Sequence, residues 1–454
     1  MLSSLIVDPS SESRLRGIHG LRAIAAGSIL VGHVWAFAPA DRHEVDLGPF
    51  NPLTSQLPLG VTLFFLLSAF LLYRPFAKAV LRGKPLPGIS RYLRNRTLRI
   101  IPAYWFILVV TGLVLQSTNV RGPNSKLVPG ALDDPLLFLM NAAFLQNFHA
   151  TTIITGIGPA WSLVIEVSFY LVLPLLGLMA WRVGARASTR HGRRLAALAP
   201  AAALFALGIS GKAVAAFVLP GEPWSPSWHA VIERSFWGHA DFFAFGLVVA
   251  VLHVEVEDGA LKLPAWAGKA AVAAFVVLGM ATAKFTTPEG LADGSASNYA
   301  YDTLMAGVLA LFLALVVLPS QERPTILVRL LETRFLVAAG VVSYSIFLWQ
   351  VPVIFWARDH GLTLAGPPGV VVNLAVLGTI MFVLSVFSYR YVEYPALTRK
   401  GKAKRRHGVE APTARRQVQA EPQAQHRVDV IDDLSRAAHS SPTGTGTSSR
   451  ASTR

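Results

Sequence analysis

The chain has 454 residues, of which 53% are hydrophobic and only 15% are charged, and its mean hydropathy is +0.47. Soluble domains carry about 25% charged residues, so this composition excludes a disordered protein and a coiled coil and argues against a soluble globular enzyme. The apolar residues stand in long runs instead of alternating with polar ones, which argues against a transmembrane β-barrel. The sequence therefore predicts an all-α, polytopic membrane protein without a β-sheet.

The net charge is +15, and the chain contains no cysteine. Between residues 399 and 454, twelve Lys/Arg stand against five Asp/Glu, and most of the remaining excess falls in short loops between apolar runs. Such placement suits membrane orientation rather than nucleic-acid binding, so no nucleic-acid partner is expected. Without cysteine there is no disulfide and no thiolate ligand, and because the histidines lack metal-ligand spacing no metal site is predicted.

Crossing the hydrocarbon core takes about 20 apolar residues. Ten segments qualify, at 18–38, 57–74, 98–117, 161–181, 195–219, 237–254, 266–283, 299–319, 336–356 and 370–390. A further apolar stretch, 135–147, is too short to cross and is predicted to be re-entrant or interfacial at the outer surface. No cleavable signal peptide is expected, because the first apolar run continues as a full span.

The distribution of Lys and Arg between the loops predicts the orientation of the spans. The loops after spans two and four are rich in these residues, and the loops after spans one, three and five are poor in them. Both termini are therefore predicted to be cytoplasmic, in a multi-pass protein of the plasma membrane. We expect a cytoplasmic segment over 1–17, a membrane domain over 18–397 and a disordered basic tail over 398–454, which has few large apolar residues.

Two ionisable residues stand in the first predicted span, where such groups are expensive and usually functional. Arg22 and His33 are eleven residues apart, which is about three helical turns, so they share one helix face about 16 Å apart. Taken alone, Arg22 is as well explained by a snorkelling, positive-inside role as by a functional one. The plain structural explanation for His33 is a hydrogen bond between helices. Because imidazole suits proton transfer near neutral pH, a functional role is favoured for His33.

A second basic pair, Arg96 and Arg99, stands at the predicted cytoplasmic entrance of the third span. Their spacing places both guanidinium groups on one helix face. Two planar guanidinium groups together favour phosphate or carboxylate ligands, although positive-inside charge is the plainer interpretation.

Acidic and amide groups are predicted in the outer parts of other spans. Glu166 falls at a depth similar to that of His33, so a hydrogen-bonded pair that orients the imidazole is possible if the two helices touch. Asp241 and Gln350 also fall in the outer third of their spans. The sequence does not explain why a lysine, Lys212, stands within the fifth span.

Six sequence pieces resemble the acyltransferase-3 family of integral membrane acyltransferases. In chain order they are RLRGIHGLRAIAAGSILVGHVW, FFLLSAFLL (64–72), RTLRIIPAYW (96–105), WSLVIEVSFYLVLP (161–174), SYSIFLWQVPV (343–353) and SYRYVEYP (388–395). The resemblance covers about residues 14–397 and includes the spacings for which the family is known, those of Arg22 with His33 and of Arg96 with Arg99. Two positions depart from it: Gln350 stands where the family often has His, and Ser68-Ala69-Phe70 replaces the usual Ser-Gly-Phe.

The resemblance implies transfer of an acyl group, commonly acetyl, from cytoplasmic acyl-CoA to a hydroxyl of a glycan, lipid or macrolide-type polyketide-sugar, often across the membrane. It implies that His33 is catalytic and that Arg22, Arg96 and Arg99 are functional. From the residues themselves, we expect the three arginines to bind the phosphates of acyl-CoA and Glu166 to assist His33 in catalysis. His33 would act as a general base or carry the acyl group, and the sequence leaves both open. We assign Asp241, Gln350 and Tyr344 to the acceptor side, without a catalytic role for Gln350.

No tightly bound cofactor is expected, since acyl-CoA is a co-substrate, and the expected partners are acyl-CoA, the acceptor and membrane lipids. No extracytoplasmic domain is expected on this chain, which would finish the transfer alone or pass the group to a separate extracytoplasmic transferase. The main alternative is a transporter or flippase for a glycan or lipid, because polar groups at depth suit that function too. A scaffold protein whose basic tail binds anionic lipid is the third possibility.

Overall fold

A computed structural model describes residues 15–40, 54, 56–219, 221, 224–264, 266–284, 294–318 and 324–398. Most of the predicted N-terminal segment and nearly all of the predicted tail lie outside these residues, so those two predictions stay untested.

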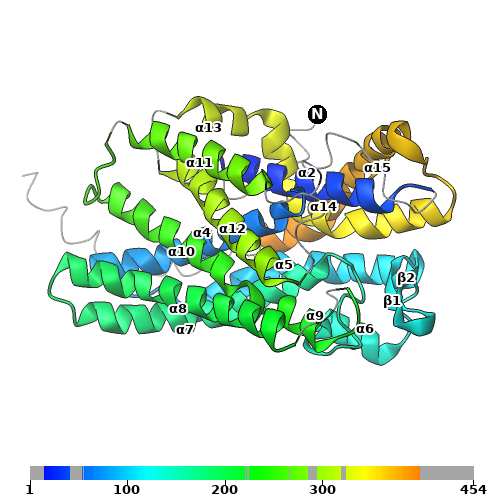
Figure 1. Cartoon of the computed structure of the whole chain (residues 1–454), viewed down its shortest axis with the longest axis horizontal. Helices are drawn as coiled ribbons and strands as arrows, with labels where there is room; N and C mark the ends of the chain where they lie inside the picture. The colour runs from blue at the N-terminus through cyan, green and yellow to red at the C-terminus, as the bar shows by residue number, and fades with distance from the viewer. Residues whose placement is uncertain are drawn as a thin grey trace, which may run out of the picture. The chain divides into compact units, whose positions relative to one another are not determined.

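The described residues form long helices joined by short connections (Figure 1). The long helices are α2 (Ile18–Phe37), α4 (Leu59–Arg82), α5 (Ile89–Val109), α7 (Ala160–Ala185), α8 (Arg190–Phe217), α10 (Phe236–Glu257), α11 (Ala267–Lys284), α12 (Ala296–Val317), α14 (Arg334–Asp359) and α15 (Gly366–Ser388). Wider π-helical turns continue two of them, η3 (Val110–Val114) after α5 and η6 (Tyr389–Glu393) after α15. The short helices are α6 (Pro135–Ala142), α9 (Trp228–Glu233) and α13 (Ile326–Leu331), with the 3-10 turns η4 (Pro123–Ser125) and η5 (Gln146–Phe148).

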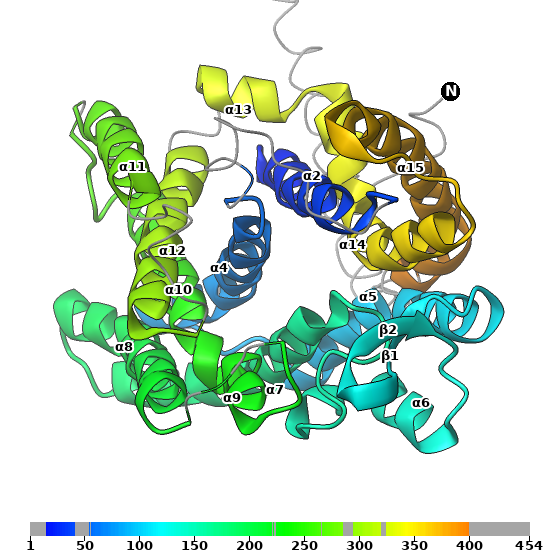
Figure 2. The ribbon, with the colours of Figure 1, turned by 45° about the vertical axis from the view of Figure 1, so that its right-hand side comes forward.

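Nine helical segments in the described part of the chain are long and apolar enough to cross a membrane, by length and composition. They fall on nine of the ten predicted spans, which confirms an all-α, polytopic membrane protein. At the tenth position, predicted over 266–283, a helix does form, but the apolar part described for it, Ala267–Ala281, is shorter than 18 residues. This helix, α11, packs along α12 (Figure 2).

The expectation of no β-sheet is wrong for the segment between α5 and α6. Strand β1 (Thr118–Arg121) pairs antiparallel with β2 (Leu127–Gly130). The side chain of Arg121 closes this hairpin by donating to the carbonyl oxygens of Ser125 at 3.0 Å and Ile153 at 2.9 Å. Four-residue strands are too short to show the alternation that reveals a strand in a sequence.

The stretch predicted to be interfacial contains α6, which has eight residues. Eight residues span about 12 Å, which is too short to cross a bilayer. Leu136 and Leu139 on this helix are largely exposed, as an interfacial helix requires.

Helix α4 lies at the centre of the packing, against α2, α7, α8, α10 and α12 (Figure 2). Close approach depends on small residues, as is usual between membrane helices. A Cβ added at Gly246 of α10 would lie 2.5 Å from Cβ of Ala69 on α4. The methyl group of Ala69, where the family usually has Gly, is thus accommodated by a glycine on the facing helix.

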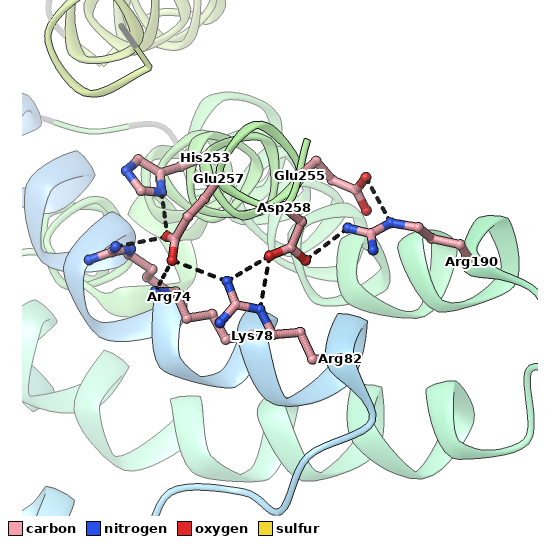
Figure 3. A network of polar contacts seen from close by, with 8 residues as sticks. All are labelled: Arg74, Lys78, Arg82, Arg190, His253, Glu255, Glu257 and Asp258. Atoms are coloured by element: carbon pink, nitrogen blue, oxygen red, sulfur yellow. Dashed lines mark hydrogen bonds and ion pairs between the residues drawn. The ribbon is translucent and has the colours of Figure 1, made fainter. Parts of the chain in front are cut away.

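Charged residues join the C-terminal ends of α4 and α10 to the N-terminal end of α8 (Figure 3). Asp258 accepts from Arg82 at 2.6 Å and from Arg190 at 2.9 Å. The neighbouring carboxylate of Glu257 accepts from Arg74 at 2.9 Å and from Lys78 at 2.7 Å. These three helix ends therefore lie together on one side of the protein, as the alternating topology predicts.

Candidate active site

A cavity of about 100 Å³ lies between five helices. Helix α4 contributes one wall, from Val61 to Leu72. The other walls come from α2, α5, α7 and α14 and include Arg22, Arg96, Arg99, Glu166 and Tyr344. The structure thus brings the three predicted acyl-CoA arginines and Glu166 together in one cavity.

Two of the arginines are fixed by the Ser-Tyr-Ser segment of α14. Nε of Arg22 donates to Oγ of Ser343 at 3.2 Å. Arg99 lies 3.4 Å from the buried carboxylate of Glu393, which also accepts from Oγ of Ser345 at 2.6 Å. Glu393 ends the wide turn η6, so the local unwinding at the end of α15 presents this carboxylate to α5.

Arg96 is held less firmly than the other two. Its guanidinium carbon lies 5.9 Å from the ring centroid of Tyr170. Its Nε is buried and has no hydrogen-bond partner among the residues that the structure describes. A buried donor without a partner costs about 1–3 kcal/mol or more when it is charged, so it indicates a missing ligand or water.

The middle of the cavity carries a carboxylate with two hydroxyl donors. Ser68 of α4 and Tyr170 of α7 both donate to Oε1 of Glu166, the tyrosine at 2.5 Å. Glu166 thus places a carboxyl group in a cavity whose basic lining residues are arginines.

The possible contact between His33 and Glu166 is not formed. His33 does not line the cavity, and its ring stacks on Phe37 at 5.5 Å. Helix α4 packs against both α2 and α7, and Glu166 takes its donors from α4 and from its own helix. The predicted similar depth of the two residues is wrong, because Glu166 shares the cavity with Arg22, about three helical turns along α2 from His33.

His33 lies instead beside Gln350 of α14. Nδ1 of His33 and Oε1 of Gln350 are both buried and lack a hydrogen-bond partner within the described part of the chain. The amide of Gln350 donates to the carbonyl oxygen of Phe347 at 3.1 Å. The position where the family often has His is therefore next to His33, and two polar atoms there can still bind a hydroxyl or a water.

The other two residues assigned to the acceptor side lie in different places. Tyr344 lines the arginine cavity, and its hydroxyl donates to the carbonyl oxygen of Ile100 at 2.9 Å. Asp241 lies in a separate cluster, where it pairs with Lys212 at 2.5 Å and accepts from Thr303 at 2.8 Å. This pair accounts for Lys212, which the sequence left unexplained.

Sequence reasoning missed three residues of the cavity and its support, namely Ser68, Tyr170 and Glu393. All three stand inside the six family pieces, so the signal was present in those motifs. Their partners belong to distant parts of the chain or follow from side-chain direction, and the residue types alone do not reveal them. No group of His, Asp and Glu that could hold a metal occurs among the described residues.

The fold and the cavity define a class of protein, a multi-pass membrane protein with a cationic cavity that also contains a carboxylate. A family model described as an acyltransferase domain matches residues 15–390. The chain therefore belongs to the acyltransferase-3 family, and the resemblance seen in the sequence is confirmed.

Two curated proteins are similar to the chain over part of its length. Acyltransferase MdmB of Streptomyces mycarofaciens is 24% identical over 283 residues, which are 60% of this chain and 64% of that protein. Nodulation protein 10 of Rhizobium leguminosarum bv. viciae is 28% identical over 177 residues, 37% of this chain and 45% of that protein. The chain thus matches less than two thirds of each relative. No solved structure matches it.

Proposed function

We propose that the protein transfers an acyl group, most simply acetyl, from cytoplasmic acyl-CoA to a hydroxyl of a glycan, lipid or polyketide-sugar at the plasma membrane. The family assignment supports the acyltransferase class, and one of the two relatives bears the name acyltransferase. The donor, the acceptor and the side of the membrane on which transfer ends belong to the proposal.

The cavity carries this proposal. It combines three arginines with Glu166 and an apolar wall from α4 that includes Phe64 and Leu71. CoA has several phosphates, and guanidinium groups bind phosphate strongly and with defined geometry. The apolar wall suits an acyl chain and the carbon skeleton of the pantetheine arm. Arg96, whose Nε lacks a partner in the described residues, is the arginine most available to a ligand.

The acceptor hydroxyl is assigned to the neighbourhood of His33. A hydroxyl can donate its one proton to Nδ1 of His33, which is buried and without a partner among the described residues. A neutral imidazole there can take the proton of that hydroxyl as it attacks.

The test is acyl transfer by the purified protein in liposomes with radiolabelled acetyl-CoA and an envelope extract as acceptor. We expect CoA release and labelled acceptor with the wild type. His33→Ala should lower transfer by about 100-fold or more, the usual contribution of a general base. His191→Ala is the matched control, because His191 is exposed near the start of α8 and far along the chain from the cavity residues.

Absence of CoA turnover with acetyl and longer acyl donors would overturn the proposal and favour the transporter alternative. If His33→Ala transferred the acyl group at the wild-type rate, the protein would still be an acyltransferase, but His33 would have no role in the reaction.

A further inference from the structure

We propose that Ser68 is an acyl-carrying nucleophile, which takes the acyl group from acyl-CoA as an oxyester before the acceptor receives it. The inference rests on the proposed function and names the residue that carries the acyl group in a covalent acyl-enzyme intermediate. It is carried by the placement of a serine hydroxyl, a carboxylate base and three guanidinium groups around one cavity.

The first observation is that Ser68 has its base in place. Oγ of Ser68 donates to Oε1 of Glu166, across the interface of α4 and α7. A serine is a weak nucleophile until a neighbouring base takes its proton, and a direct hydrogen bond to that base is the structural sign of activation. The second donor to the same oxygen, Tyr170, fixes the carboxylate so that it faces Ser68.

The second observation is that the hydroxyl is open to the cavity. Ser68 lines the cavity wall, and its residue is only partly buried, whereas both of its chain neighbours, Leu67 and Ala69, are buried. Ser162, another serine of this wall, is buried and donates to the carbonyl oxygen of Pro159 at 3.0 Å. Ser68 is therefore the cavity serine that combines access with a carboxylate partner.

The third observation is the charge around the hydroxyl. Attack on a thioester creates a tetrahedral oxyanion, which needs preorganised donors nearby. Arg22, Arg96 and Arg99 line the same cavity, and Arg96 lies over the ring of Tyr170, the residue that shares the carboxylate with Ser68. A guanidinium group in this position can stabilise the oxyanion as well as the phosphates of the donor.

The position of Ser68 along α4 suits a relay between the two sides. It is the tenth of 24 residues in this helix, so it lies about 14 Å from one end and about 21 Å from the other. His33 lies about 16 Å along α2 from Arg22 and outside the cavity wall. A group held on Ser68 would thus have left the donor while still being within the protein.

The chemistry balances in two steps. In the first, Oγ of Ser68 attacks the thioester carbonyl carbon and its proton passes to Glu166. The carbon–sulfur bond then breaks, and the CoA thiolate leaves with the proton from Glu166. In the second, the acceptor oxygen attacks the carbonyl carbon of the Ser68 ester inside the cavity and its proton passes to Glu166. Glu166 then returns this proton to Oγ of Ser68 as the bond between that oxygen and the acyl carbon breaks.

The experiment is single-turnover labelling of the full-length protein with radiolabelled acetyl-CoA in the absence of acceptor, followed by acid quench and peptide mass spectrometry. We expect one acetyl group on Ser68, stable to neutral hydroxylamine as a serine ester is. Ser68→Ala should lose the label, and Glu166→Gln should slow labelling by about 100-fold. Ser168→Ala is the control, because Ser168 lies on α7 near Glu166 but donates to the carbonyl oxygen of Val164 and does not line the cavity.

Ser68→Cys guards against a variant that fails to fold. It should accept the acyl group as a thioester, which neutral hydroxylamine cleaves, so the lability of the label should change with the residue. His33→Ala should still label Ser68, because His33 does not line the cavity.

Four results overturn the inference while the proposed function stands: transfer at the wild-type rate by Ser68→Ala, a label on His33, a label on another residue, or transfer without any trapped label. Complete absence of CoA turnover in the wild type would instead remove the proposed function and the inference together.

Discussion

The three cavity arginines differ in what holds them, and this difference sets the expected effect of replacing each one. Arg99 faces the carboxylate of Glu393, and Arg22 donates to Ser343. Arg96 has a ring contact but no ion pair with any described residue. Replacing Arg99 would leave a buried carboxylate without its cation, so loss of stability would mix with loss of binding. Arg96 is the position where binding can be tested alone.

We predict that Arg96→Ala raises the KM for acyl-CoA at least about tenfold with a smaller change in kcat, because a hydrogen bond to a charged group contributes about 1.5–3 kcal/mol. Arg96→Lys should recover part of this loss, since it keeps the charge but not the planar fork. Steady-state CoA release measures both. Arg94→Ala, an exposed arginine of the same helix, should behave as the wild type, and an unchanged KM in Arg96→Ala would contradict the placement of the donor.

The residues of the site were only partly predictable from the sequence. Arg22 was predictable because charge within a span is rare. Arg96 and Arg99 were predictable because they share a helix face at the entrance of a span and match the spacing of the family. Glu393 and Ser68 were not, because their roles depend on partners in α5 and α7 that only the packing of helices brings near. The same limit explains the wrong prediction of similar depth for His33 and Glu166, since Glu166 lies in the cavity with Arg22.

At the scale of helices, one buried ion pair connects α8, α10 and α12. Nζ of Lys212 lies 2.5 Å from Asp241 and donates to Thr303 at 2.7 Å, and both charged side chains are almost fully buried. A buried pair is weak evidence for net stability, but removal of one partner leaves an uncompensated charge, which costs about 3–5 kcal/mol.

We therefore predict that Asp241→Ala lowers the thermal unfolding temperature of the detergent-solubilised protein strongly, and that the double variant Lys212→Met, Asp241→Leu recovers most of the loss. The double variant also separates structure from function. If it regains stability but not acyl transfer, Asp241 acts on the acceptor side as the sequence suggested. Equal unfolding temperatures for wild type and Asp241→Ala would show that the pair does not hold these helices together.

The ion network of Figure 3 gives a second prediction at this scale, concerning pH. Burial alone would raise the pKa of Asp258, but hydrogen bonds from Arg82 and Arg190 outweigh it and hold this pKa below its usual 3.8. Since the pKa is lower in the folded state, the network stabilises the protein fully above about pH 4 and loses this contribution as the pH falls through the depressed value.

Asp258→Asn should accordingly be less stable than the wild type at pH 7, by about 1 kcal/mol for a pair near the surface. The two unfolding temperatures should converge as the pH falls below about 4 and through the depressed pKa of Asp258. High salt should narrow the gap at pH 7, because it screens exposed charges. A gap that stays constant between pH 7 and pH 3 would show that Asp258 does not act through its charge.

At the scale of the whole molecule, hydropathy predicted nine membrane helices close to their observed positions. The first was expected over 18–38 and is Ile18–Phe37, because its apolar run and its helix coincide. The third was expected over 98–117 but begins at Ile89. Its first turns carry arginines that hydropathy excludes from a span although they continue the helix. The hairpin at β1 and β2 escaped prediction because its strands are short.

The last prediction concerns α11 and the orientation of the chain. The sequence contains no cysteine, so each introduced thiol is a unique reporter. With ten spans, Ser188→Cys and Ala260→Cys should be cytoplasmic, and Thr151→Cys and Ser297→Cys should lie outside; all four positions are exposed. A membrane-impermeant thiol reagent should therefore label only the latter two in right-side-out vesicles.

Because α11 lies between Ala260 and Ser297, labelling of Thr151→Cys without labelling of Ser297→Cys would show that α11 does not cross the membrane. Labelling of Ser188→Cys but not of Thr151→Cys would show that the chain has the opposite orientation in the membrane.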